Sequence, residues 1–85
     1  MQKITIYIKT GSPRCDEAMQ YFREKGMGIA VVNVSENQSA LKAMIDKSGQ
    51  MEVPVIVIDE DDREEVMIGF NRERLEEYIS FDPER

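Results

Sequence analysis

The sequence predicts an α/β domain with the element order β-α-β-α-β-β-α and a mixed four-stranded sheet flanked by three helices. Short runs rich in β-branched residues alternate with stretches whose apolar residues recur at helical spacing. An opening strand–helix–strand unit requires a parallel pair with a right-handed crossover, and two strands close together near the end favour an antiparallel hairpin. At 85 residues, we expect one domain, 1–85, with one modest core.

The first strand spans residues 3–8, where isoleucine alternates with threonine and tyrosine. Ser12 and Pro13 then begin a helix, because a hydroxyl at the N-cap and proline at the first helical position are both favoured there. Gly26 and Gly28 end it. Its inward stripe consists of Cys15, Ala18, Met19 and Phe22.

The second strand, residues 29–34, is apolar nearly throughout, which is typical of a strand covered on both faces. Residues 35–38 (Ser-Glu-Asn-Gln) fit a capping box that begins the second helix, and Ser48-Gly49 ends it. The buried face of this helix is Ala40, Leu41, Met44 and Ile45.

The third strand, residues 53–58, is wholly apolar, and Pro54 must begin it or lie on an edge because proline cannot donate to a sheet ladder. Residues 59–65 are predicted to form an acidic turn and residues 66–68 a short fourth strand. Asn71 caps the last helix. The inner face of that helix is Leu75, Tyr78 and Ile79.

The composition excludes several classes of function. A net charge of −6 and a pI near 4.6 argue against nucleic acid or an anionic membrane as partner, since both require a positive patch. One cysteine excludes a disulfide-stapled scaffold, and the N-terminus enters a strand without room for a signal peptide. No apolar run approaches the roughly 18–20 residues that span a bilayer. The acidic run 59–65 lacks the ligand spacing of a calcium loop, so we expect a cytoplasmic protein without a metal site.

Four segments carry a family resemblance. They are Ile6-Tyr7-Ile8-Lys9 followed by Ser12-Pro13-Arg14-Cys15; Ala18-Met19-Gln20-Tyr21-Phe22 with Lys25-Gly26; Ser48-Gly49-Gln50-Met51-Glu52-Val53-Pro54; and Gly69-Phe70 ahead of Leu75. In this order they resemble the strand and C-P-x-C motif, the active-site helix, the T-V-P segment and the G-F ending of glutaredoxin-type proteins. The resemblance covers essentially the whole chain and implies the thioredoxin fold.

The resemblance also implies a site. Pro54 would be cis and lie beside the Ser12–Cys15 loop, where the backbone of Val53 would pair with an extended thiol substrate such as glutathione or a protein segment. Lys9 would lie near the substrate carboxylate or the attacking thiolate. The remaining positions taken over from the family's substrate groove are Pro13, Arg14, Gly69, Phe70 and Asn71. Glutathione would be a co-substrate rather than a bound cofactor, with a disulfide-containing protein or a thioredoxin-type reductase as possible partners.

The chain departs from the family at the residue that starts the chemistry. Ser12 stands at the nucleophile, and the only cysteine, Cys15, is at the position of the resolving thiol. Serine cannot form a mixed disulfide, and one cysteine cannot close an intrachain disulfide. Arg14 also replaces the usual aromatic residue and Glu52 the threonine of T-V-P, while the Gly-Gly pair of glutathione-binding members is absent.

Simpler interpretations compete at each position. Ser12 can be only an N-cap, Cys15 only a small buried hydrophobe, and Lys9 and Arg14 only solvated charges. Those two cations beside a helix N-terminus are equally suited to an anionic ligand.

Three hypotheses follow for the function. In the first, the chain is a glutaredoxin-type thiol-disulfide oxidoreductase and electron carrier in which serine, native or engineered, stands in place of the nucleophile. In the second, it is a non-catalytic binding module for glutathione or a peptide or protein partner. In the third, Cys15 works alone as a monothiol or regulatory redox site.

Overall fold

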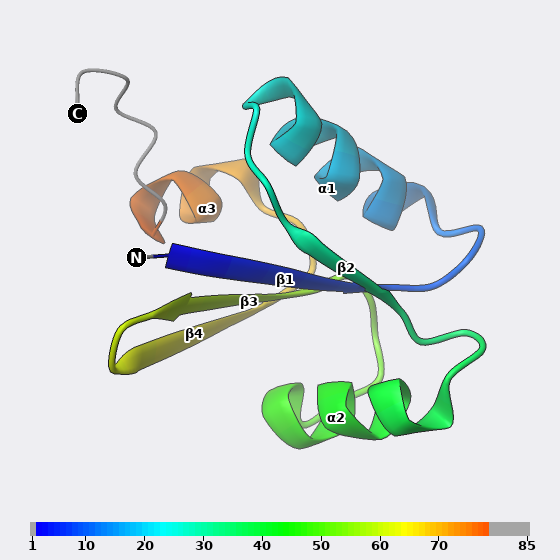
Figure 1. Ribbon diagram of the computed structural model, residues 1–85. Coiled ribbons are helices and arrows are strands. Elements are labelled where there is room, and N and C mark those ends of the chain that lie inside the picture. Colours follow the sequence, from blue (N-terminus) through cyan, green and yellow to red (C-terminus); the bar gives the residue numbers. More distant parts are fainter. Residues whose placement is uncertain (1, 79–85) are drawn as a thin grey trace.

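The computed structural model describes residues 2–78 and confirms the predicted order of elements (Figure 1). The strands are β1 (Gln2–Ile8), β2 (Ala30–Asn33), β3 (Val55–Glu60) and β4 (Arg63–Ile68), and the helices are α1 (Pro13–Glu24), α2 (Gln38–Ser48) and α3 (Arg72–Tyr78). Leu75 is buried on α3 as predicted. Ile79 and the side chain of Tyr78 lie outside the described part of the chain.

The four strands form one mixed sheet in the order β2-β1-β3-β4. β1 pairs with β2 in parallel, and β3 is antiparallel to both β1 and β4. The helices α1 and α3 cover one face of the sheet and α2 the other (Figure 1). This confirms the predicted sheet and adds the strand order, which sequence patterning does not contain.

The sheet divides the hydrophobic core in two, where the sequence predicts one. Side chains alternate between the faces along β1 and β3, so that Ile6 faces α1 while its neighbour Tyr7 faces α2. Under α1 and α3 the buried residues are Ile4, Ile6, Ala18, Tyr21, Phe22, Ile56, Ile58, Met67 and Leu75. Under α2 they are Tyr7, Val34, Met44, Val55 and Val57.

The expectation that both faces of the second strand are covered is wrong. β2 is shorter than predicted, spanning Ala30–Asn33, and it lies at the edge of the sheet. Ala30 and Asn33 are exposed, and Val31 keeps 45% of its surface in solvent. The apolar run therefore correctly predicts a strand here but does not indicate whether that strand is central or at the edge of the sheet.

The acidic turn is also shorter than predicted. β3 continues to Glu60 and β4 begins at Arg63, which leaves only Asp61 and Asp62 between them. Asp61 has a φ of +54°, the left-handed conformation that aspartate tolerates in tight turns. Charged residues form this part of β4 because an edge strand pairs through its backbone while its side chains reach solvent.

One of those charges ties the hairpin to α2. Lys47 Nζ donates a hydrogen bond to Glu64 Oε2 at 2.7 Å. This hydrogen bond raises the pKa of Lys47 and lowers the pKa of Glu64. Both side chains are partly solvated, so the pair adds little to the unfolding free energy.

The second helix begins at a different cap from the one predicted. Asn37 is the N-cap, and its Oδ1 accepts a hydrogen bond from the Ala40 amide at 3.0 Å. Ser35, the predicted cap, instead accepts from the amide of Thr10 at 2.9 Å. The capping-box pattern failed because the serine hydroxyl bonds a segment 25 residues away rather than its own helix.

We expect Asn37→Ala to lower the unfolding free energy by about 1 kcal/mol, because the Ala40 amide loses its acceptor. Urea unfolding followed by circular dichroism measures this loss. Ser39→Ala is the matched control, since Ser39 is exposed in the first turn of α2, and we expect it to stay within about 0.5 kcal/mol of the parent. Equal effects of the two substitutions would contradict the assignment of the cap.

Candidate functional site

Two hydrogen bonds join three segments, distant in the sequence, at the end of the sheet where β1 and β4 finish and β3 begins. The Gly69 amide donates to the Pro54 carbonyl at 2.8 Å, and Arg14 Nη2 donates to the Phe70 carbonyl at 3.3 Å. The strand register accounts for this meeting, because Val55 is paired with both Tyr7 and Ile68. The start of β3 therefore lies level with the end of β1 and the end of β4. The first turn of α1 with the loop before it, the Val53–Pro54 segment and the Gly69–Phe70 turn are together called the groove segments, after the substrate groove that the family resemblance implies.

Ser12 occupies the N-cap of α1. Its Oγ accepts a hydrogen bond from the Cys15 amide at 3.4 Å, and its carbonyl accepts from the Asp16 amide at 3.1 Å. Pro13 follows at the first helical position and is exposed. The capping role predicted for Ser12 is confirmed, and its hydroxyl lies at the end of the helix where the amide dipoles favour negative charge.

Cys15 is the free thiol of the chain, and only 1% of its surface reaches solvent. It lies one turn into α1, on the face that packs inward with Ala18 and Phe22. A covered thiol cannot meet a disulfide in solution without movement of the surrounding chain. This burial favours the interpretation of Cys15 as a small core residue.

The chain segment that precedes Pro54 is held by hydrogen bonds from Gln50, a residue that sequence reasoning did not single out. Its side chain accepts a hydrogen bond from the Glu52 amide and donates one to the Glu52 carbonyl at 3.1 Å. The side chain of Val53 packs against the core cluster under α2, and the peptide bond between Val53 and Pro54 is cis.

A second set of hydrogen bonds holds the loop between β1 and α1, which begins at the half-buried Lys9. Asn33 Nδ2 donates to Thr10 Oγ1 at 2.9 Å, and the Ser35 amide donates to Asn33 Oδ1 at 2.8 Å. With the bond from the Thr10 amide to Ser35, they clamp this loop to the end of β2. Sequence reasoning missed this clamp: it assigned Ser35 to a helix cap, and the two bonds to Thr10 span 23 and 25 positions, which leaves no local pattern.

The turn between β4 and α3 carries the remaining predicted positions. Gly69 has a φ of +83°, a conformation that favours glycine, and a Cβ there would lie 3.9 Å from Arg14 Nη2. Asn71 Oδ1 accepts from the Arg74 amide at 3.0 Å and so caps α3 as predicted. Phe70 packs its ring against Tyr21 with the ring centroids 5.5 Å apart.

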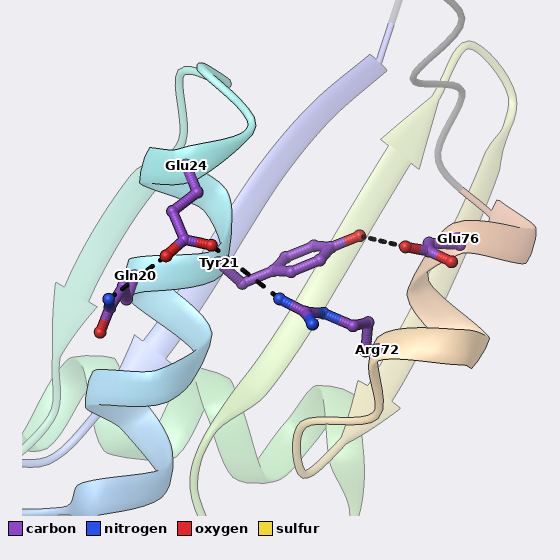
Figure 2. Close-up of polar contacts among 5 residues, drawn as sticks. All are labelled: Gln20, Tyr21, Glu24, Arg72 and Glu76. Carbon is purple, nitrogen blue, oxygen red and sulfur yellow. Dashed lines mark hydrogen bonds and ion pairs between the residues drawn. The ribbon is translucent and has the colours of Figure 1, made fainter.

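A cluster of polar side chains lies between α1 and α3 (Figure 2). Arg72 stacks its guanidinium 5.1 Å from the Tyr21 ring centroid and lies 3.9 Å from Glu24. The Tyr21 hydroxyl donates to Glu76 at 3.5 Å, and burial together with the Glu76 charge raises the pKa of Tyr21. These side chains lie beside an open hollow of about 320 Å³. Its lining is Glu17, Gln20, Tyr21, Glu24, Phe70 and Arg72.

No metal site or membrane helix is evident in the described part of the chain. Residues 2–78 contain no group of three or more histidine, cysteine, aspartate or glutamate side chains arranged to hold a metal ion. None of the helices within those residues is long and apolar enough to cross a membrane.

Solved structures with the same arrangement place the fold in the thioredoxin class. The thioredoxin-like protein BC3987 has a TM-score of 0.79 at 22% identity, covering 91% of this chain and 100% of its own. The glutaredoxin of Archaeoglobus fulgidus has a TM-score of 0.73 at 22% identity, covering 91% of this chain and 85% of its own. The NrdH-redoxin of Escherichia coli has a TM-score of 0.72 at 20% identity, covering 92% of this chain and 96% of its own.

Sequence comparison then gives the family. The Glutaredoxin family model matches residues 4–62. An uncharacterised glutaredoxin-like 8.6 kDa protein of the rubredoxin operon of Clostridium pasteurianum is 30% identical, over 89% of this chain and 96% of its own length. The gene 56 protein of Mycobacterium phage D29 is 31% identical, over 92% of this chain and 83% of its own. The chain belongs to the glutaredoxin family.

Proposed function

We propose that this member of the glutaredoxin family binds an extended thiol or disulfide ligand, such as glutathione or a cysteine-containing segment of a partner protein, without carrying out two-thiol exchange. The observation that carries the proposal is that the groove segments meet around a cis Val53–Pro54 peptide bond, while a hydroxyl stands at the nucleophile position. Segments that the family resemblance assigns to ligand binding therefore lie together, and the atom that would react with the ligand is absent.

The missing step is specific. In exchange, a thiolate attacks one sulfur of a disulfide, a new S–S bond forms, and the other sulfur leaves as a thiolate. The Ser12 hydroxyl is not ionised near neutral pH, and an oxygen cannot take the place of the attacking sulfur. Cys15 carries the right atom, but it is covered by the chain.

Binding is supported by what remains at the groove segments. Arg14 is exposed and bonded through Nη2 to the Phe70 carbonyl, so its guanidinium is held where the three segments meet. Lys9 adds a second cation in the loop that precedes α1. On a chain of net charge −6, these two cations beside the start of α1 favour an anionic ligand, and both ends of glutathione carry a carboxylate.

Titration with oxidised glutathione, and separately with a cysteine-containing peptide, followed by NMR of the ¹⁵N-labelled protein tests the proposal. We expect saturable shifts at the amides of Ser12, Val53 and Gly69. Arg14→Ala should weaken binding at least about fivefold, because it removes a charge-assisted contact. Arg63→Ala is the matched control, since it removes an equally exposed arginine at the far end of β4. Absence of saturable shifts with both ligands would refute the proposal.

The alternative in which Cys15 acts alone makes a different prediction, which we test by alkylation with iodoacetamide. We expect the native protein to react at least about 100-fold more slowly than the protein in denaturant, because 1% exposure hides the thiolate from the reagent. Mass spectrometry of quenched samples gives both rates. Comparable rates would show that Cys15 is accessible and would favour a monothiol redox role.

A further inference from the structure

We infer that β2 is an association edge through which two copies of this chain pair, antiparallel, into one continuous sheet. A strand at the edge of a sheet presents unpaired backbone groups to any other strand, and proteins protect such edges with charges, prolines or covering segments. The two edges of this sheet, β2 and β4, differ in that protection.

The β4 edge carries its own protection. Arg63, Glu64 and Glu65 occupy the first half of that strand, and Lys47 of α2 reaches it through the ion pair with Glu64. A second strand pairing with β4 would have to pack against these charged side chains. The β4 edge therefore disfavours self-pairing.

The β2 edge has no such charges. Residues 26–35 contain no aspartate, glutamate, lysine or arginine, and this is the longest uncharged run in the sequence. No proline interrupts it. On a chain in which a third of the residues are charged, this run offers a surface where two copies of net charge −6 can meet without facing charges.

An apolar hollow of about 260 Å³ lies beside the same edge, between β2 and α1. Its lining is Met19, Phe22, Arg23, Met27, Ile29 and Val31. Val31 keeps 45% of its surface exposed at the rim. In a pair of β2 strands related by a two-fold axis, the two Val31 side chains lie on the same face of the joined sheet and cover one another across the axis.

Two opposite charges near the two ends of the run favour a second copy as the occupant and the antiparallel direction. Arg23, which lines the hollow, precedes β2, and Glu36 follows it. In an antiparallel pair the start of one strand lies beside the end of the other, so Arg23 approaches Glu36 of the partner subunit, and the same contact forms twice. A four-residue strand buries little area, so we expect a weak, concentration-dependent dimer.

Sedimentation equilibrium of the full chain from about 10 µM to about 1 mM tests the inference. We expect the average mass to rise from 9.8 kDa toward that of a dimer. Val31→Lys should weaken association at least about tenfold, because it places a charge on the pairing edge. Ile68→Lys is the matched control, since Ile68 is 53% exposed on β4, and it should change association less than about twofold. A mass of 9.8 kDa at every concentration, or equal effects of both lysines, would overturn the inference.

Charge exchange tests the orientation without depending on Val31. Arg23→Glu and Glu36→Lys should each weaken self-association, the second even though it makes the net charge less negative. An equimolar mixture should associate at least about threefold more tightly than either variant alone, since both contacts then join opposite charges. Circular dichroism confirms that each variant is folded. A mixture no tighter than its components would overturn antiparallel pairing.

Discussion

Ser12→Cys is expected to raise glutathione-dependent reduction of a small mixed disulfide at least about 10³-fold above the parent chain. The introduced thiol lies at the N-cap of α1, where the helix amides stabilise a thiolate. Its sulfur attacks the glutathione sulfur of the mixed disulfide and forms a new S–S bond, and the other half of the mixed disulfide leaves as a thiolate. A second glutathione thiolate then attacks this enzyme–glutathione disulfide, which forms oxidised glutathione and frees the enzyme thiolate. A coupled assay with glutathione reductase follows the turnover.

Ser39→Cys provides the matched control for this prediction. It introduces the same atom at an exposed position in the first turn of α2, away from the groove segments. We expect it to stay close to the parent rate. If Ser12→Cys were equally inactive, the groove segments would not support exchange, and the binding proposal would rest on the titration alone.

Adding Cys15→Ser to Ser12→Cys separates the roles of the two positions. Reduction of a mixed disulfide with glutathione needs only the first thiol, so this activity should survive in the double variant. Reduction of a protein disulfide needs a second thiol to release the captured chain, so it should fall at least about tenfold. Loss of both activities would mean that Cys15 supports the fold of α1 rather than the second step.

Phe22→Ala is expected to lower the unfolding free energy by about 3–5 kcal/mol. Phe22 is fully buried on the inward face of α1, and its ring meets the Tyr21 ring edge-on with the centroids 5.5 Å apart. Such a loss is a large part of the stability of a domain this small. Urea unfolding of the parent and the variant measures it.

Met51→Ala is the control for core packing, because Met51 is 54% exposed, and we expect it to cost less than about 0.5 kcal/mol. Phe22→Ala should also expose Cys15, because Phe22 and Cys15 share the inward face of α1. Alkylation of native Phe22→Ala should therefore be faster than that of the parent. A loss below about 1 kcal/mol would contradict the central place of Phe22 in this core.

The pattern of residues in the sequence was sufficient for the order of elements and for the chemistry that the chain lacks. Strands, helix stripes and the caps at Ser12 and Asn71 depend on neighbours within a few positions, and such patterns are visible along the chain. That this chain cannot close an intrachain disulfide follows from residue identity alone, because it has one cysteine.

The tertiary structure decided what depends on distant partners. The edge position of β2 and the two-residue hairpin differ from the sequence predictions because strand pairing sets them. The cap of α2 is Asn37 rather than Ser35 because the Ser35 hydroxyl accepts a hydrogen bond from Thr10, 25 residues away. The contact of Arg14 with Phe70 spans 56 positions, and the burial of Cys15 depends on how α1 packs on the sheet. Local sequence specifies the elements, whereas long-range packing and hydrogen bonds determine which atoms of the site meet and whether the one thiol of the chain is buried.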